Sequence, residues 1–219
     1  MNNRSKMSDF KKLLCAAVCA CGLLLPLEAG AAGRDAKLDD YSFIEMINSV
    51  DLGDQSDFIQ QFQNKEARAK LLPKYNGKDG CTVENYRNKE VLLITIPARL
   101  LFAPNETLLN DKASEYLQPL RRYLRQPDTY RVLLVMHTDN TGSELYRDEI
   151  TEERVESIFE WFEESGSDTS YLFPYAMGDE MPIYENDSQK NRDANRRLEV
   201  FLMPGKKMLD QAKKGRIEF

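Results

Sequence analysis

The run from Tyr130 to Met136 constrains the fold of this chain more than any other feature. It reads Tyr-Arg-Val-Leu-Leu-Val-Met and is almost continuously apolar. A strand that is covered on both faces has this pattern, because neither of its faces meets water. A polar loop, His137 to Ser143, follows at once. We therefore predict a buried central strand whose carboxyl end leads into a polar loop.

Other patterns on either side of this run predict the rest of a small domain. Strands are expected at 91–96, where Pro97 ends the run, at 171–177 and at 197–203. A helix is expected over 110–126, kinked or restarted by Pro119, which lacks an N–H. A second helix is expected from Thr151 to Gly166, with apolar residues at helical spacing. This order predicts an α+β fold, a βαβαββ two-layer sandwich with helices on one face of a mixed sheet.

The N-terminal end has the composition of an export signal. Residues 1–31 run from basic to apolar to small side chains, the order of a secretory signal peptide, with cleavage expected near Ala31. The apolar run Leu13–Leu27 is shorter than the roughly 20 residues that span a bilayer. Two alternatives stay open, lipid attached to Cys21 and an uncleaved anchor. No later stretch approaches a span, so the mature chain is predicted to lack one.

Four segments are predicted along the chain. The signal peptide, 1–31, precedes a helical N-terminal segment and linker at 32–90, in which one helix starts near Ser56 and ends before Pro73. Residues 74–90 are polar and rich in turn formers, and we interpret them as linker. The domain occupies 91–204, and a loose basic tail follows at 205–219.

Composition argues against several classes of protein. The formal net charge of −6, without a large basic field, gives no reason to expect nucleic-acid binding. The one histidine, His137, cannot build a multi-histidine metal site, so no metal is expected. We find no recognisable nucleophile elbow, phosphate loop or paired catalytic carboxylates, and therefore expect neither an enzyme nor a cofactor.

Two opposite charges are placed to share a pocket. Asp139 lies in the polar loop beyond a strand's carboxyl end, and Arg154 follows in the next helix. A carboxylate beside a guanidinium suits a zwitterion, since the first accepts an ammonium and the second binds a carboxylate in bidentate fashion. Thr151 is expected to cap the helix, whose N-terminus would add donors for the same carboxylate. The alternative is a plain Asp139–Arg154 ion pair that steadies the loop.

Several motifs occur together in a known order. They are Leu101-Phe102, His137-Thr138-Asp139-Asn140-Thr141-Gly142-Ser143, Thr151-x-x-Arg154, Gly178-x-x-x-Pro182-Ile183 and Asn195-Arg196-Arg197-Leu198-Glu199-Val200. In this order they resemble the C-terminal domain of the OmpA family over residues 91–204.

The resemblance implies non-covalent binding of peptidoglycan through the meso-diaminopimelate of its stem peptide. Asp139 matches the residue of the family that binds the ammonium, and Arg154 the residue that binds the carboxylate. It also implies a periplasmic protein of a Gram-negative-type bacterium, held at the cell wall and in some cases attached to the outer membrane. The expected ligand-binding residues are Thr138, Asp139, Asn140, Gly142, Arg147, Thr151, Arg154 and Arg196.

Two departures from the family pattern keep an alternative open. Arg147 stands where the family has Asn, and Met136 where it has Gly. If Arg147 filled the pocket, the fold would serve instead as a protein–protein interaction module that binds an envelope protein without binding the wall.

Overall fold

A computed structural model describes residues 42–219 of the chain, which divides into two compact units, residues 1–49 and Val50–Phe219. In the first unit, helix α2 (Phe43–Asn48) begins with a capping box, in which Ser42 and Glu45 each satisfy the backbone N–H of the other. The predicted signal peptide, its cleavage site and Cys21 lie outside the described residues. Within 42–219, no helix is both long enough and apolar enough to cross a bilayer.

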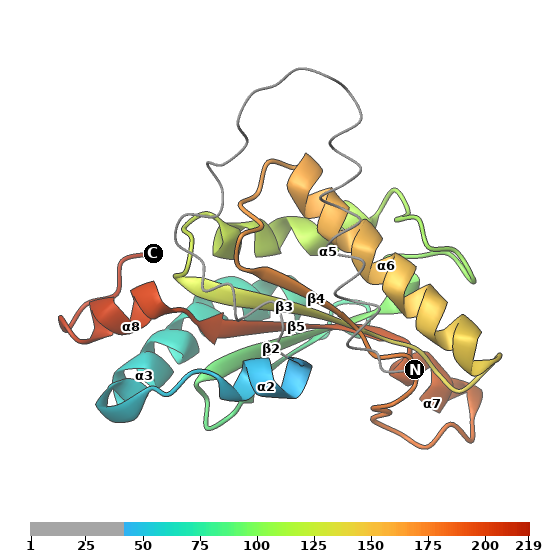
Figure 1. Ribbon diagram of the computed structural model, residues 1–219, viewed down its shortest axis with the longest axis horizontal. Helices are drawn as coiled ribbons and strands as arrows, with labels where there is room; N and C mark the ends of the chain where they lie inside the picture. Colours follow the sequence, from blue (N-terminus) through green and yellow to red (C-terminus); the bar gives the residue numbers. More distant parts are fainter. Residues whose placement is uncertain (1–41) are drawn as a thin grey trace. The chain divides into compact units, whose positions relative to one another are not determined.

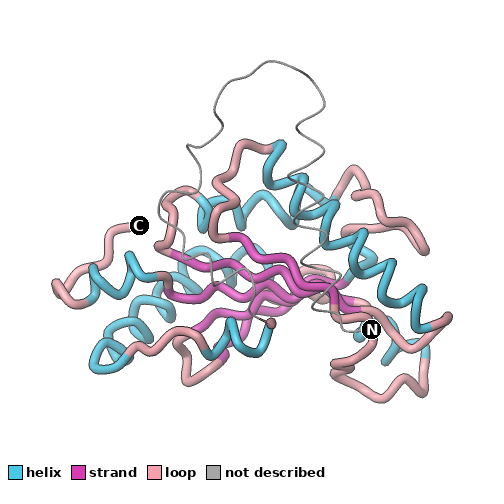
Figure 2. The backbone as a smooth tube through the Cα atoms, in the orientation of Figure 1, coloured by secondary structure: helices cyan, strands magenta, loops and turns pink. Residues whose placement is uncertain are grey.

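The second unit is built on one five-stranded mixed sheet (Figures 1 and 2). The strands lie in the order β1-β2-β5-β3-β4. Only the β3–β4 pair is parallel, and its two strands are joined through helix α6. Their bounds are β1 Thr82–Tyr86, β2 Val91–Pro97, β3 Tyr130–His137, β4 Leu172–Ala176 and β5 Arg197–Pro204.

Strand β3 lies inside the sheet, as its apolar run predicts. It pairs with β5 on one side and with β4 on the other, and every residue except Arg131 is buried. Strand β4 follows a long helix because parallel strands need a crossover connection. The predicted βαβαββ order and the mixed sheet are confirmed.

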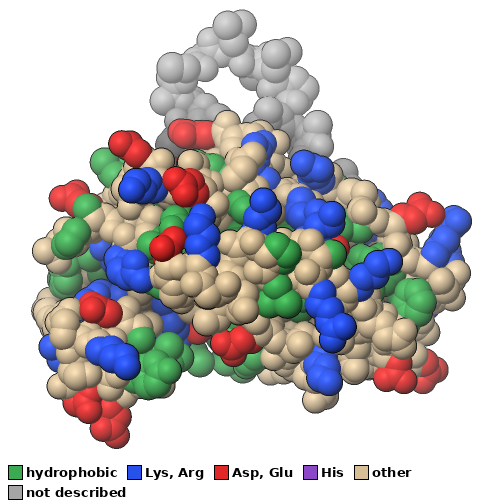
Figure 3. Space-filling model, turned by 180° about the vertical axis from the view of Figure 1, so that it is seen from behind, with side chains coloured by type: hydrophobic (Ala, Val, Ile, Leu, Met, Phe, Trp, Pro, Cys, Tyr) green, Lys and Arg blue, Asp and Glu red, His purple; other side chains and the backbone are tan. Residues whose placement is uncertain are grey.

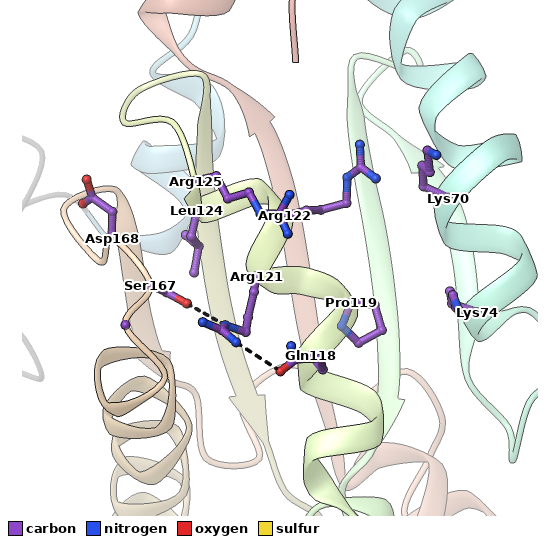
Figure 4. A pocket seen from close by; sticks show the side chains of 11 residues that line it. Lys70, Lys74, Gln118, Pro119, Arg121, Arg122, Leu124, Arg125, Ser167 and Asp168 are labelled. Atoms are coloured by element: carbon purple, nitrogen blue, oxygen red, sulfur yellow. Dashed lines mark hydrogen bonds between the residues drawn. The ribbon is translucent and has the colours of Figure 1, made fainter.

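A layer of helices covers one face of the sheet, and Figure 4 shows helical segments side by side in front of the strands. Helix α5 (Ala113–Leu117) passes into the 3₁₀ segment η6 (Gln118–Leu124), which starts one residue before Pro119. The predicted restart at Pro119 is thereby confirmed. The other segments are helix α6 (Glu144–Glu164) and a continuous stretch of α3 (Ser56–Glu66), the π-helical η4 (Ala67–Leu71) and α4 (Leu72–Tyr75).

The structure corrects three sequence-based expectations. The linker interpretation of 74–90 is wrong, because β1 forms an antiparallel hairpin with β2 there. The predicted helix end before Pro73 is also wrong: the π-helical turn η4 precedes Pro73, which lies in the first turn of α4, where its missing N–H is tolerated. The tail is not loose throughout, since it forms α8 (Lys206–Ala212), which buries Met208 and Ala212. Three short helices complete the unit, namely η3 (Gly53–Gln55), η5 (Ala98–Leu100) and α7 (Gln189–Asn195).

Candidate functional site

Asp139 lies two residues beyond the carboxyl end of β3, and it is fully buried. Its Oδ1 accepts a hydrogen bond of 2.7 Å from the backbone N–H of Thr141 and a second one from the Thr141 hydroxyl. This local turn is the usual behaviour of an aspartate that bonds the backbone two residues further on. The carboxylate is therefore held in place by its own loop.

The second oxygen of Asp139 is paired with Arg196, which directly precedes the first residue of β5 and also donates to Asp193. Burial by itself would raise the pKa of Asp139. The hydrogen bonds from Thr141 and the positive charge of Arg196 outweigh burial, so the pKa is lowered below its ordinary value. Asp139 is therefore ionised at neutral pH and presents a negative charge at this end of the sheet.

Arg154 lies in the middle of α6, not in its first turn, and its side chain is buried. Its Nε donates to the carbonyl of Glu106 at 2.9 Å and its Nη2 to that of Ala103 at 3.4 Å. The guanidinium also lies over the ring of Phe102, 4.9 Å from its centroid. Among residues 42–219, Nη1 donates no hydrogen bond.

Asp139 and Arg154 do not pair with each other. Asp139 is paired with Arg196, and Arg154 is bonded to the 103–106 loop, so the alternative of a plain Asp139–Arg154 ion pair is wrong. Burial is the main cause that lowers the pKa of Arg154, and the nearby positive charge of Arg196 adds to it. A guanidinium nevertheless stays charged at neutral pH. The site therefore holds one carboxylate and two guanidiniums.

Thr151 does not cap a helix, which corrects the sequence-based expectation. Helix α6 begins at Glu144, and its N-cap is Ser143, whose hydroxyl accepts from Tyr146 N at 3.2 Å. Thr151 is buried in the interior of α6. Its hydroxyl is 3.0 Å from the Arg147 carbonyl and accepts from Gly178 N at 3.2 Å. No helix N-terminus at Thr151 can therefore bind a ligand carboxylate; this hydroxyl joins α6 to the turn after β4.

The remaining loop residues have different surroundings. Thr138 is buried and its N–H donates to the Gly178 carbonyl at 2.8 Å, whereas the side chain of Asn140 is exposed. Gly142 has a φ of +84°, and a Cβ there would come within 2.6 Å of Tyr146 Cδ1. Glycine is therefore required, because the left-handed backbone and the ring together leave no room for a side chain.

Arg147 bonds to the loop backbone and to Asp179, and not to Asp139. Its Nη1 donates to the Gly142 carbonyl at 2.8 Å, and its Nε lies 2.7 Å from Asp179 Oδ1. It thereby connects the loop after β3 with the turn after β4. This arrangement makes Arg147 a residue that positions the loop.

The structure adds residues that the sequence-based set leaves out. Asn195 is buried and orders the 183–186 segment, because its Oδ1 accepts from the N–H groups of Ile183 and Tyr184 and its Nδ2 donates to the Tyr184 carbonyl. The Asn-Arg-Arg motif was the signal that could have identified it. Arg197 donates to Glu199 at 2.7 Å and to the carbonyls of Asn195 and Met181.

His137 belongs to the same buried cluster. Its Nε2 lies 3.3 Å from Glu199 Oε2. Burial lowers the pKa of His137 against the opposing effect of the Glu199 carboxylate, so the ring is neutral at pH 7. Within the described part of the chain, no group of three metal-ligating side chains comes together. The site thus consists of fixed charges and hydrogen-bond donors, an arrangement suited to binding a charged ligand.

Residues 101–196 match the model of the OmpA family. The matched segment includes the loop with Asp139, Arg154 and Arg196.

The chain is similar in sequence to two bacterial outer-membrane proteins. The chain is 30% identical over 105 residues to the outer-membrane lipoprotein YfiB of Pseudomonas aeruginosa, an overlap of 48% of this chain and 62% of that protein. It is 24% identical over 114 residues to outer membrane protein A of Bordetella avium, an overlap of 52% of this chain and 59% of that protein. The chain thus spans less than two thirds of the length of either relative.

Solved structures have the same fold. A MotB-like protein from Desulfovibrio vulgaris superposes with a TM-score of 0.60 at 21% identity, over 68% of this chain and 98% of that one. The cell wall anchor of the T6SS from Pseudomonas aeruginosa superposes with a TM-score of 0.51 at 19% identity, over 67% of this chain and 96% of that one.

Proposed function

We propose that the domain binds peptidoglycan non-covalently and holds the protein at the cell wall. The observation that carries the proposal is the ionised, fully buried Asp139 beyond the carboxyl end of β3, in a segment that matches the model of the OmpA family. A charge that is fixed before the ligand arrives needs little reordering on binding. The fold shared with a protein described as a cell wall anchor supports the same function. Catalysis is not part of the proposal.

The ligand proposed at this site is the zwitterionic end of meso-diaminopimelate in the stem peptide. Asp139 accepts its ammonium group, and the Nη1 of Arg154, which is free of protein partners within 42–219, binds its carboxylate. Arg196 gives way to the ammonium at Asp139, because Asp193 offers it a second carboxylate. Thr138, Asn140 and Gly142 form the loop around the ligand, and Arg147 and Thr151 hold that loop in place.

This proposal places the protein in the periplasm of a Gram-negative-type bacterium. The two relatives are described as an outer-membrane lipoprotein and an outer membrane protein, which supports a location in the cell envelope. Attachment to the outer membrane through lipid on Cys21 remains part of the proposal, as an alternative to signal cleavage near Ala31.

A second candidate function is binding of an envelope protein. Large apolar side chains are exposed on three segments around the site. They are Leu108 at 76%, Leu145 at 57%, Ile183 at 50% and Tyr184 at 55%. Side chains of this kind, placed near a polar centre, are typical of protein interfaces.

Sedimentation of the purified chain with insoluble peptidoglycan tests the proposal. The chain should sediment with diaminopimelate-type wall and much less with lysine-type wall, whose side chain lacks the second carboxylate. Asp139→Ala and Arg154→Ala should each leave most of the protein in the supernatant. Asp210→Ala and Arg216→Ala are matched controls, because both side chains are exposed on the C-terminal segment, and they should sediment like the wild type.

Each outcome decides one part of the proposal. Equal sedimentation with the two walls would reject the diaminopimelate ligand and keep wall binding. A wild-type chain that stays in solution with both walls would reject wall binding and favour the envelope partner. Circular dichroism of each variant separates a lost contact from a lost fold.

A further inference from the structure

A pocket with a volume of about 540 Å³ lies among the helical segments on the face of the sheet that they cover (Figure 4). Its lining residues come from η4 and α4 on one side, from η6 in the middle and from the turn after α6 on the other side. Five cationic side chains line it, Lys70, Lys74, Arg121, Arg122 and Arg125, against one acidic side chain, Asp168.

Most of this positive charge has no carboxylate partner among the described residues. Within residues 42–219, the side chains of Lys70, Lys74 and Arg125 form no hydrogen bond or ion pair, and all three residues are exposed. Arg121 donates only to uncharged oxygens, among them the hydroxyl of Ser167 at 3.3 Å and the carbonyl of Ser165. The guanidinium of Arg121 is thereby fixed in direction while its charge remains uncompensated.

The other two charged residues of the pocket, Arg122 and Asp168, each have a partner. Arg122 pairs with Glu66 at 3.1 Å, yet its buried Nε has no hydrogen-bond partner within the described chain. Asp168 accepts from the N–H of Ser170 at 3.0 Å. A buried N–H without a partner is rare in folded proteins and calls for an explanation such as an unseen ion.

The pocket is separate from the site at Asp139. Segment η6 leads into β3 and the turn after α6 leads into β4, so the pocket lies toward the amino ends of these two strands, whereas Asp139 follows the carboxyl end of β3. Strand β3 is roughly 25 Å long at about 3.3 Å per residue. The proposed wall-binding function uses none of the pocket's residues.

The charge of the pocket contrasts with that of the whole chain, whose net charge is −6. Figure 3 shows that Lys and Arg side chains are nevertheless spread over the face seen from behind. Like charges gathered in a concave site repel one another, and the repulsion is relieved when an anion enters. Arginine forks and lysine ammonium groups together are the usual recognition groups for phosphate.

We propose that this pocket, referred to below as the cationic pocket, binds a phosphate-bearing anion with more than one negative charge. Arg121, fixed by Ser165 and Ser167, contributes its guanidinium on the side of the turn after α6, and Lys70 and Lys74 contribute ammonium groups on the side of η4 and α4. Arg125 closes the site at the end of η6. The phosphate belongs either to a small soluble anion or to a lipid headgroup, and the two sources share this chemistry.

Calorimetric titration of the full chain with inorganic pyrophosphate, and flotation with vesicles of phosphatidylglycerol or phosphatidylcholine, test the proposal. The variant Lys74→Gln/Arg125→Gln should weaken binding by about tenfold or more, because it removes two charged contacts from exposed positions. Lys112→Gln/Lys214→Gln is the matched control, with the same change of charge at exposed positions outside the pocket, and it should bind like the wild type.

The two assays distinguish a soluble anion from a lipid headgroup. Pyrophosphate binding that the pocket variant loses supports a soluble anion. Binding to phosphatidylglycerol vesicles alone, lost in the same variant, supports a headgroup. No binding to either probe, or an equal loss in both double variants, overturns the proposal. Asp139→Ala should leave this binding unchanged, so failure of wall binding and failure of the cationic pocket are independent results.

Discussion

The charged side chains near the two ends of β3 differ in whether they are paired with an opposite charge. Beyond its carboxyl end, Asp139, Arg196 and Arg147 are each paired with an opposite charge, and Arg154 is bonded to two carbonyls. Toward its amino end, the cationic pocket leaves most of its charges without a carboxylate.

The difference shows what each end can contribute. Paired and buried charges hold loops in one geometry, so their removal lowers stability as well as binding. Unpaired charges on the surface contribute little to stability and remain available to a ligand. Substitutions at the carboxyl end are therefore expected to change both stability and binding, whereas substitutions at the amino end are expected to change binding alone. The following substitutions test this contrast.

Arg154→Ala should have the largest effect on stability. It removes the donor to the carbonyls of Glu106 and Ala103 and the contact with the Phe102 ring, and we expect the free energy of unfolding to fall by about 3 kcal/mol. Urea unfolding followed by circular dichroism measures it. Arg154→Lys is the conservative control and should recover part of the loss. A loss below about 0.5 kcal/mol, which is typical of substitutions at surface positions, would contradict the expected difference in stability between the two ends of β3.

Asp139→Asn should lower the free energy of unfolding by about 2 kcal/mol at neutral pH, because it removes the charge that pairs with Arg196. The folded-state pKa of Asp139 is lowered, so its stabilising effect is present above the ordinary carboxyl pKa of about 3.9 and is lost as the pH falls through the lower folded value. The difference between wild type and variant should be constant from pH 7 to 5 and shrink in stronger acid. A difference that grows on acidification would contradict the lowered pKa.

Arg147→Gln and Asp179→Asn break the same ion pair between the loop and the turn after β4. Each should lower the free energy of unfolding by about 1 kcal/mol, because the pair is partly exposed. The double variant should lose no more than Arg147→Gln alone, because both substitutions break the same pair and Arg147→Gln also removes the bond to the Gly142 carbonyl. Additive losses in thermal unfolding would mean that the two residues act separately.

Lys74→Gln/Arg125→Gln should have the smallest effect. Neither side chain has a partner within the described residues, and we expect a change in the free energy of unfolding of less than about 0.5 kcal/mol. At low salt the double variant should even be slightly more stable, because the repulsion among the cations of the pocket is reduced. A large destabilisation in the same urea assay would show that these cations support the fold.

Much of the fold could be predicted from local pattern. The four strands from β2 to β5 and the break of a helix at Pro119 follow from apolar runs and from proline. The hairpin strand β1 could not be found, because Thr82–Tyr86 is polar and mostly exposed, and its strand conformation depends on pairing with β2. The start of α6 was missed because Leu145 and Tyr146 are exposed, which breaks the apolar stripe.

The candidate site could also be predicted only in part. Local sequence is enough to predict which charges are present, that Asp139 follows a buried strand and that Gly142 lies in its loop, since these features depend on residues close together in the chain. The pairing of Asp139 with Arg196, and not with Arg154, depends on tertiary packing, as does the presence of Lys70 and Lys74 in one pocket with the arginines of η6. Those neighbours come from segments far apart in the chain, and the packing of helices on the sheet, which no local pattern encodes, brings them together.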